Sequence, residues 1–343
     1  MDANRPVRVV VDVMGGDEPP QVVLDGIAAA LHADPNVTVL AAGPEDIVTP
    51  FADAHERCEA LVAPDVIAMG DDPIQAVMTK RKSSIVLGCR AVKKGSADGF
   101  FSAGSTGACV AAGTAYITPF KVESEDGERR PIRPCITSAL PNRAGGLTVF
   151  TDMGGNPDVE PEDVVRFAQM GSAYATAVLG IEHPRVGLLS NGTEEHKGSR
   201  FTQSCLPLMR AQVPGFTGNC EGTDLTSGNV DVIACDGFTG NVALKATEGA
   251  AKFLLSELKG ALMSSVRGKL AALLVKDSLR EIKAKLSGDE RGGAILLGLR
   301  GVLLIGHGAT SVEAVKNGTL ATANAVRADL IDRVAASMPG IVR

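Results

Sequence analysis

Short runs of β-branched and other apolar residues alternate with segments whose apolar residues recur three and four positions apart, through almost the whole chain. The short runs predict strands at residues 7–13, 37–42, 98–102, 136–140, 147–152, 185–189, 230–235 and 302–305. Helical spacing is clearest at residues 22–32, 74–92 and 164–179. Such alternation predicts an α/β fold in which helices cover both faces of a large, mostly parallel sheet.

Three segments depart from this rhythm. Residues 136–140 and 147–152 are neighbouring strands joined by a turn of Pro, Asn and Gly, which predicts an antiparallel hairpin and therefore a mixed sheet. Residues 119–134 are dense in charge and proline and are expected to form a solvated loop. Residues 252–285 have helical spacing throughout and contain no predicted strand.

Length and composition fit one large globular unit. We expect a single catalytic α/β domain over residues 1–343, with residues 250–287 as an amphipathic helical protrusion from it. A hydrophobic content of 45% with 22% charged residues is enough to bury a sizeable core. A net charge of −6, no tryptophan and only two tyrosines disfavour nucleic acid as a partner.

The cysteines and the N-terminus indicate the compartment. Seven cysteines are scattered along the chain without a C-x-x-C pair, which is typical of free thiols in a reducing compartment and not of a disulfide framework or a zinc site. The N-terminus has no signal-peptide pattern, and no stretch reaches the ~20 apolar residues of a membrane span. We therefore expect a soluble, cytoplasmic protein.

Four turns share one design, in which an apolar strand runs into Gly, Ser, Thr or Asp and then towards a helix. At the carboxyl ends of parallel strands, glycine-rich turns and helix N-termini offer N–H groups to anions. The candidate anion-binding residues in these turns are Asp12, Gly15, Gly16, Asp17, Ser102, Gly104, Ser105, Thr106, Gly107, Asp236, Gly237, Thr239, Gly240, His307 and Gly308.

Any one of these turns is more often a simple connection between a strand and a helix. Four such turns, each with hydroxyls, a carboxylate or an imidazole, favour a binding site for a small anion such as inorganic phosphate. The patterns of a P-loop, a dinucleotide fingerprint, a zinc protease and a serine nucleophile elbow are absent.

A fifth segment, residues 188–198, ends in two glutamates, a histidine and Lys197. Lys197 follows a predicted strand, where it could meet an anion held by the turns. An exposed helix start, with Glu194 and Glu195 near the positive end of the helix dipole, explains the same spacing equally well.

Taken together, these segments closely resemble the PlsX family, the phosphate acyltransferases of bacterial phospholipid synthesis. The resembling stretches, in chain order, are residues 12–17, 80–84, 102–108, 133–134, 152–156, 194–198, 219–224, 235–249 and 306–308. The most specific is CDGFTGNVALK, which begins at Cys235. The sequence departs from the family pattern at Ser105, Gly155, Ser190, Ala309 and Thr310.

The resemblance implies transfer of a long acyl chain from acyl carrier protein to inorganic phosphate, followed by consumption of the acyl phosphate by a membrane glycerol-3-phosphate acyltransferase. It implies a fold like that of isocitrate and isopropylmalate dehydrogenases and phosphotransacetylase, and a homodimer. Lys82 and Ser83, in a matching stretch, join the candidate substrate-binding residues. No metal or cofactor is implied.

Phosphate is already an anionic nucleophile, so the chemical tasks are to hold it against a thioester and to stabilise the tetrahedral oxyanion. Turn N–H groups with Lys197 suit the first task, and the amide of Asn241 suits the second. Lys197 could instead protonate the departing thiolate. The acids Asp12, Asp17 and Asp236 would repel phosphate, so they either orient its ligands or simply cap turns.

Residues 252–285 carry eight basic and three acidic side chains, a balance of +5 that leaves −11 on the rest of the chain. Apolar residues at helical spacing, Leu262, Leu270, Leu273 and Leu274 among them, complete a basic amphipathic pattern. The pattern suits an anionic membrane surface or an acidic carrier protein. A helix pair in a dimer contact is the alternative, and the family resemblance favours peripheral membrane contact.

Three other functions fit parts of the sequence. An oxidoreductase of the isopropylmalate dehydrogenase type would need a cluster of metal-binding aspartates, but Asp12, Asp152 and Asp236 show no helical D-x-x-x-D arrangement. A phosphotransacetylase would use the same chemistry with coenzyme A thioesters. A membrane-bound scaffold without catalysis would require that the departing turn residues abolish anion binding.

Overall fold

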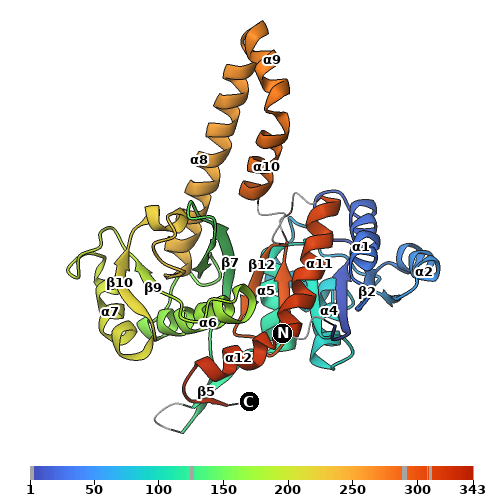
Figure 1. The fold of residues 1–343 in the computed structure, drawn as a ribbon. Helices are drawn as coiled ribbons and strands as arrows, with labels where there is room; N and C mark the ends of the chain where they lie inside the picture. Colours follow the sequence, from blue (N-terminus) through green and yellow to red (C-terminus); the bar gives the residue numbers. More distant parts are fainter. Residues whose placement is uncertain (1–3, 124–126, 288–291, 307, 309–310, 343) are drawn as a thin grey trace.

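The computed structural model describes residues 4–123, 127–287, 292–306, 308 and 311–342. Its main sheet has eleven strands in the order β10-β9-β11-β8-β7-β12-β13-β4-β1-β2-β3 (Figure 1). These strands are β1 Val7–Asp12, β2 Val37–Gly43, β3 Cys58–Val62, β4 Gly99–Ser102, β7 Cys135–Pro141, β8 Leu147–Thr151, β9 Val186–Leu189, β10 Phe216–Cys220, β11 Val232–Ala234, β12 Ala294–Leu297 and β13 Val302–Ile305. The expected α/β fold with a large mixed sheet is confirmed.

The sheet consists of two groups of parallel strands that run in opposite directions. The first strand group is β3, β2, β1, β4 and β13, and the second is β8, β11, β9 and β10. Between them lie β12 and β7, which pair antiparallel with each other and with β13 and β8 on either side. The pairing of β7 with β8 is the antiparallel hairpin that the sequence predicts.

Helices cover both faces of this sheet. Leu303 and Leu304 are neighbours on β13 but belong to different core clusters, because successive strand residues point to opposite faces. Helices α1, α6, α11 and α12 pack on the face of Leu304, while α3, α4, α5 and the start of α8 pack on the face of Leu303. The helices are α1 Gln21–Ala33, α2 Glu45–Ala54, α3 Pro73–Thr79, α4 Ser84–Lys93, α5 Thr106–Ala112, α6 Pro161–Leu179, α7 Arg200–Gln212, α8 Gly237–Met263, α9 Val266–Leu274, α10 Lys276–Ser287, α11 Val312–Arg327 and α12 Leu330–Ser337.

A small sheet corrects the prediction of a solvated loop at residues 119–134. Strand β5 (Lys121–Glu123) pairs antiparallel with β6 (Arg129–Pro131) and with β14 (Ile341–Val342). The third strand comes from the end of the chain, more than 200 positions away along the sequence. Local charge and proline content carry no information about such a distant pairing partner.

Two helical predictions also need correction. Residues 74–92 do not form one helix, because α3 ends at Thr79 and α4 begins at Ser84. Ser83 interrupts the pattern by acting as the N-cap of α4, where its hydroxyl accepts a hydrogen bond from the Val86 N–H. Lys197 does not lie at a helix start either, since α7 begins at Arg200.

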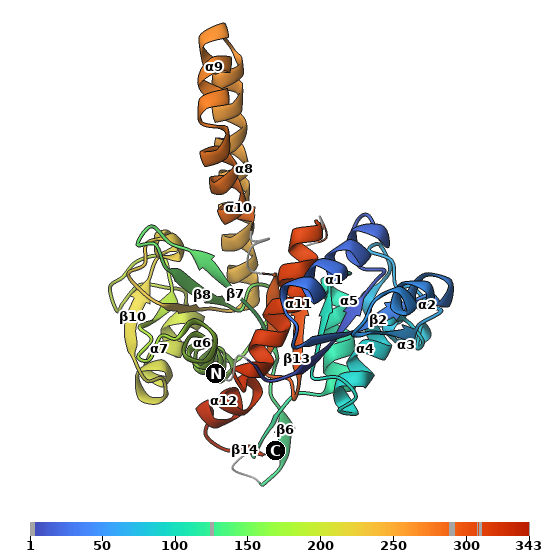
Figure 2. The same ribbon diagram turned by 45° about the vertical axis from the view of Figure 1, so that its right-hand side comes forward.

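Helices α8, α9 and α10 form a protrusion that stands out from the sheet (Figures 1 and 2). The predicted protruding helical segment is present, but three helices form it rather than a pair, and the first begins at Gly237. Its first turns, with Ala243 and Leu244, pack on the sheet, whereas Leu270, Leu273 and Leu274 are exposed. Among the described residues, no helix is long and apolar enough to cross a bilayer.

Candidate active site

Asp12 is the centre of the first turn cluster, which comprises residues 12–17, 83–84, 102–107, 306 and 308. Its carboxylate is 3% exposed and lies at the end of β1. One oxygen accepts a hydrogen bond from the Ser102 hydroxyl at 2.7 Å and the other from the Met14 N–H at 3.1 Å. The Ser84 hydroxyl also bonds to this carboxylate, so Asp12 joins the ends of β1 and β4 to the start of α4.

The backbones of this cluster approach each other closely. A Cβ on Gly15 would lie 2.7 Å from the Gly104 nitrogen, so a side chain at Gly15 would push β1 and β4 apart. The Gly104 N–H donates to the Ser102 hydroxyl, and the Asp17 N–H donates to the Gly308 carbonyl. The glycines therefore allow three turns to pack together.

Helix α5 presents unpaired donors at this cluster. Ser105 is its N-cap, and its hydroxyl accepts a hydrogen bond from the Ala108 N–H. Thr106 and Gly107 belong to the first helical turn, whose N–H groups have no partner within the helix, and both residues are exposed. These N–H groups point the positive end of the helix dipole at solvent, which suits an anion.

Asp152 organises a second turn cluster, which comprises residues 152–156, 190–198 and 236–241. It is fully buried at the end of β8. Its Oδ1 accepts hydrogen bonds from the N–H groups of Ile136, Gly154 and Gly155, and its Oδ2 accepts two from Asn156.

The start of α8 packs against the turn that Asp152 organises. Asp236 caps α8 by accepting hydrogen bonds from the Thr239 N–H at 2.8 Å and the Thr239 hydroxyl at 2.7 Å. A Cβ on Gly240 would lie 1.8 Å from the Asp152 carbonyl oxygen, so only glycine permits this contact. The Gly237 and Gly240 N–H groups are bonded to Asn156 and Asp236 carbonyls. Most first-turn donors of α8 are therefore committed within the protein, and the turn-capping interpretation of Asp236 is confirmed.

Asn241 and Lys197 both belong to the second turn cluster. The side chain of Asn241 lies against Gly154, with its Cβ 3.2 Å from the position that a Gly154 Cβ would take. Lys197 is half-buried in the loop after β9, and its side chain lies along Gly192. The pairing of Leu188 with Ala234 places the ends of β9 and β11 side by side, so both residues follow adjacent strands.

The four turns do not surround one point. The first turn cluster lies at the ends of β1, β4 and β13, and the second at the ends of β8, β9 and β11. Two strands, β12 and β7, separate β13 from β8, a spacing of roughly 14 Å. Because Val10 and Phe150 share one core cluster, the residues two positions beyond them, Asp12 and Asp152, face the same side of the sheet. The two clusters thus lie on one face of the sheet, three strand spacings apart.

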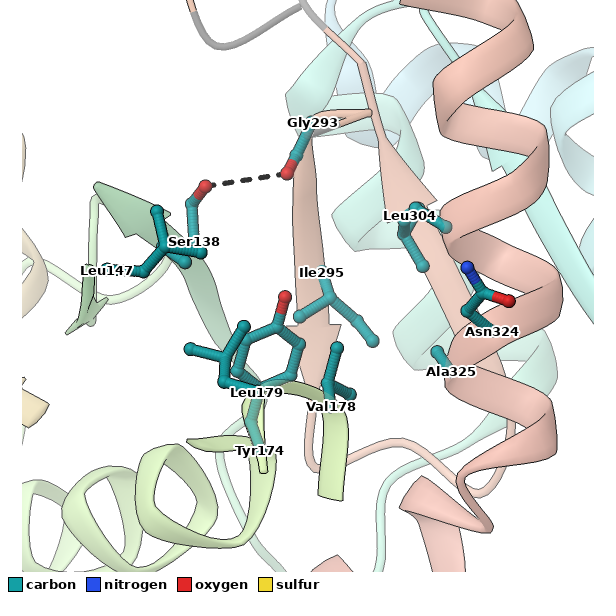
Figure 3. A pocket seen from close by; sticks show the side chains of 12 residues that line it. Ser138, Leu147, Tyr174, Val178, Leu179, Gly293, Ile295, Leu304, Asn324 and Ala325 are labelled. Carbon is teal, nitrogen blue, oxygen red and sulfur yellow. Dashed lines mark hydrogen bonds between the residues drawn. The ribbon is translucent and has the colours of Figure 1, made fainter. Parts of the chain in front are cut away.

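A pocket of about 150 Å³ lies on the other face of the sheet, between α6 and α11 (Figure 3). Its wall is mostly apolar, with Tyr174 of α6, Ile295 of β12 and Leu304 of β13. At its rim the Ser138 hydroxyl donates to the Gly293 carbonyl at 3.4 Å. The sheet separates this pocket from both turn clusters.

Some of the predicted site residues have other roles in the structure, and the sequence did not predict Asp152 as a site residue. Ser83 is buried as the N-cap of α4, and Lys82 is exposed, with its N–H bonded to Asp65. His307, Ala309 and Thr310 lie outside the described residues. Asp152 was not among the candidate site residues, although its D-x-G-G turn repeats the strand–Asp–Gly–Gly design of the first turn.

The cysteines are poor nucleophiles in this fold. All seven are free and buried. Burial raises the pKa of Cys109, beside Ser102, to about 12, and that of Cys135, beside Thr151, to about 12. These thiols stay protonated near neutral pH. In the described parts of the chain, no group of three or more His, Cys, Asp and Glu side chains is placed to hold a metal ion.

Sequence comparison identifies close relatives along almost the full length. The profile of the family described as fatty acid synthesis protein matches residues 7–333. A phosphate acyltransferase of Brevibacillus brevis is 38% identical over 334 residues, 97% of each chain. Another, from Levilactobacillus brevis, is 41% identical over 315 residues, 91% of this chain and 89% of its own.

Solved structures share the fold at low sequence identity. A phosphotransacetylase from Streptococcus pyogenes superposes with a TM-score of 0.60 at 14% identity, over 95% of this chain and 96% of its own. A 4-hydroxythreonine-4-phosphate dehydrogenase from Klebsiella pneumoniae gives a TM-score of 0.53 at 10% identity, over 94% and 99% of the two chains. The expected dehydrogenase-like and phosphotransacetylase-like fold is confirmed.

Burial of Asp12 leads to a pH-dependent prediction. Desolvation raises its pKa above 3.8, although hydrogen bonds from Ser84, Ser102 and Met14 oppose the shift. Between 3.8 and the raised pKa, the native state holds a proton that the unfolded state has lost, so this group lowers stability as pH rises through that window. Asp12→Asn removes the titrating carboxyl group, and with it this loss of stability as the pH rises. The unfolding free energy of the variant relative to wild type should therefore increase with pH across the window and level off above it.

Urea unfolding of both proteins, at intervals from about pH 4 to pH 8, measures this difference. A difference that stays constant over the whole range would show that the Asp12 carboxyl does not titrate differently in the two states.

Proposed function

We infer that this chain, which belongs to the fatty acid synthesis protein family, is a phosphate acyltransferase that moves a fatty acyl group from acyl carrier protein to inorganic phosphate. The observation that carries this conclusion is the similarity, over nearly the whole chain, to proteins named phosphate acyltransferase. The carrier protein as acyl donor is the more specific part of the proposal.

The reaction needs little acid–base help. A phosphate oxygen attacks the carbonyl carbon of the thioester, and the carbonyl oxygen becomes an oxyanion in the tetrahedral intermediate. The carbon–sulfur bond then breaks, which leaves acyl phosphate and a thiolate that takes up a proton. Positioned donors that meet the oxyanion, and a cation that holds the phosphate, supply the catalysis.

Lys197 and Asn241 are the proposed catalytic residues. Both belong to the second turn cluster, and Lys197 is the half-buried cation of the loop after β9. Asn241 lies beside Gly154, where its amide can donate to a developing oxyanion. Lys197 either holds the phosphate or protonates the thiolate. The open N–H groups of Thr106 and Gly107 in the first turn cluster then contact another part of the thioester substrate.

The product suggests where the protein works. An acyl phosphate carries a long apolar chain, and a membrane glycerol-3-phosphate acyltransferase is its proposed consumer. The helical protrusion suits contact with an anionic membrane, because Val266 is 85% exposed, Leu274 82% and Leu273 70%. Leu262 instead lines a groove of about 490 Å³ between the helices, with Leu258 among its neighbours. A second copy of the chain covering this groove would give the homodimer that the resemblance implies.

The activity test uses acyl carrier protein thioester and phosphate, with hydroxylamine to trap acyl phosphate as a hydroxamate. We expect hydroxamate formation that depends on phosphate. Replacing the carrier thioester with acyl-coenzyme A tests a phosphotransacetylase, and adding NAD tests an oxidoreductase. Phosphate-dependent product from neither thioester would overturn the proposed function.

Loss of either catalytic side chain should stop turnover without unfolding the protein. Asn241→Ala should lower kcat by roughly a hundred- to a thousandfold, the usual cost of one oxyanion donor, and Lys197→Ala by at least about a hundredfold. Steady-state hydroxamate assays measure both. Lys245→Ala, one turn further along α8, is a matched control that should keep the wild-type rate.

Lys197→Arg separates the two roles of the lysine. Arginine keeps the positive charge but does not release a proton near neutral pH. Retained kcat with a raised KM for phosphate indicates phosphate binding, and a kcat as low as that of Lys197→Ala indicates proton donation. Near-normal turnover by Lys197→Ala or Asn241→Ala would remove that residue from the mechanism.

Membrane contact is tested at the tip of the protrusion. The double variant Leu273→Glu, Leu274→Glu should lower binding to vesicles with anionic lipid by at least about tenfold, because each buried leucine contributes ~1.5–3 kcal/mol. Co-sedimentation with anionic and with neutral vesicles measures binding, and light scattering checks that the oligomeric state is kept. Val62→Glu, an exposed apolar residue of β3, is the matched control. Equal sedimentation of the double variant and wild type would refute membrane contact through this tip.

A further inference from the structure

Outside residues 237–287, which hold α8, α9 and α10, all but one of the exposed large apolar side chains of the described chain fall in one region, the exception being Val312. Of the large apolar residues with exposed side chains, Val62, Met69, Ile74 and Met78 fall within 17 consecutive positions. Ile74 is 66% exposed and Met78 62%, and both lie on α3. Two such side chains on a short helix form an apolar patch that the described chain leaves uncovered.

Basic side chains border this patch. Arg81 and Lys82, between α3 and α4, are exposed, and the Arg81 Nε donates to the Met78 carbonyl at 3.0 Å. Arg90 lies 4.7 Å from the ring centre of Tyr116, and its guanidinium donates to the Arg81 carbonyl at 3.5 Å. These contacts hold Arg81 and Arg90 next to each other. We call Ile74, Met78, Arg81, Lys82 and Arg90 the α3–α4 surface.

Three carboxylates lie near this surface and offset part of its charge. Asp71 forms an ion pair with Lys80 at 2.5 Å, and the Lys80 ammonium holds the pKa of Asp71 below its usual value. Asp72 caps α3 by accepting from the Gln75 N–H, and Asp65 accepts from the Lys82 N–H. Asp65 and Asp72 keep their charge, but Arg81, Lys82 and Arg90 outnumber them, so the α3–α4 surface remains net positive.

The surface adjoins the first turn cluster directly. Lys82 is followed by the buried Ser83 and Ser84, and Ser84 bonds to Asp12. At the other end, Pro73 of α3 lies 2.7 Å from the position that a Cβ on Gly107 would take. A protein seated on α3 and α4 would therefore stand beside the open N–H groups of α5.

We propose that the α3–α4 surface is the docking site for the acidic acyl carrier protein, an inference that rests on the proposed function. Cationic side chains around an apolar centre match an acidic helical partner that delivers a thioester on a long flexible arm. From this seat the arm crosses the first turn cluster on the same face of the sheet and brings the thioester towards Lys197 and Asn241. The two turn clusters then have different tasks, the first for the arm and the second for phosphate and the reacting carbonyl.

The test compares a carrier-bound thioester with a small one. Arg81→Glu should raise the KM for acyl carrier protein thioester about tenfold and weaken its dependence on salt, because charges at the rim of an interface act mainly on association. The same variant should keep wild-type kcat/KM with acyl-pantetheine, which has no protein to dock. Ile74→Ser, which tests the apolar centre, should show the same split between the two substrates.

Lys94→Glu is the matched control, since it reverses an exposed charge at the opposite end of α4 and should leave both KM values unchanged. Thermal unfolding checks that each variant is folded. An unchanged KM for the carrier thioester in both Arg81→Glu and Ile74→Ser would overturn the docking site, as would an equal loss with acyl-pantetheine. Failure of the wild-type protein to make acyl phosphate from either substrate is a different result, and it contradicts the proposed function itself.

Discussion

A carboxylate that is removed from water needs hydrogen-bond donors on both oxygens, and Asp12 and Asp152 each obtain them from more than one segment of the chain. Asp12 takes donors from the ends of two strands and the start of a helix. Asp152 takes five, four of them from its own turn and one from the neighbouring strand. Because these donors come from several points along the chain, satisfying one carboxylate fixes the geometry of a whole turn cluster. Asp12, an acid that looked out of place beside an anion, is thus a structural support of its turn cluster.

Local patterns in the sequence were enough to predict most strands of the main sheet. Strands such as β1 and β13 are continuous apolar runs, and the β7–β8 hairpin has a short turn, so each is readable within a window of about ten residues. The small sheet could not be predicted from local patterns, because β5 pairs with a strand from the other end of the chain. The break between α3 and α4 coincides with a capping serine within an otherwise helical spacing.

The residues of the candidate site could be proposed from the sequence, but their arrangement could not. Lys197, Asn241 and the glycine turns were identified from spacing and resemblance, yet nothing in their order along the chain tells which strand ends lie together. That information is in the strand directions, since the two parallel groups run oppositely and β12 and β7 stand between them. One expected site thus became two clusters on one face, a layout that fits a long substrate better than a small one.

The late position of β13 in the chain affects the order in which the two strand groups can fold during translation. The second strand group, together with β7, is built from a continuous stretch, from Cys135 to Ala234, and can pack as soon as it leaves the ribosome. The first strand group cannot, because β13 and α11 are supplied by residues 302–327, and Gly318 of α11 packs directly on the ring of Phe101. The part of the chain that is translated first is therefore completed last. Until translation ends, the apolar face of β1 and β4 stays uncovered. Chaperone binding or rapid completion of the fold then limits aggregation through this face.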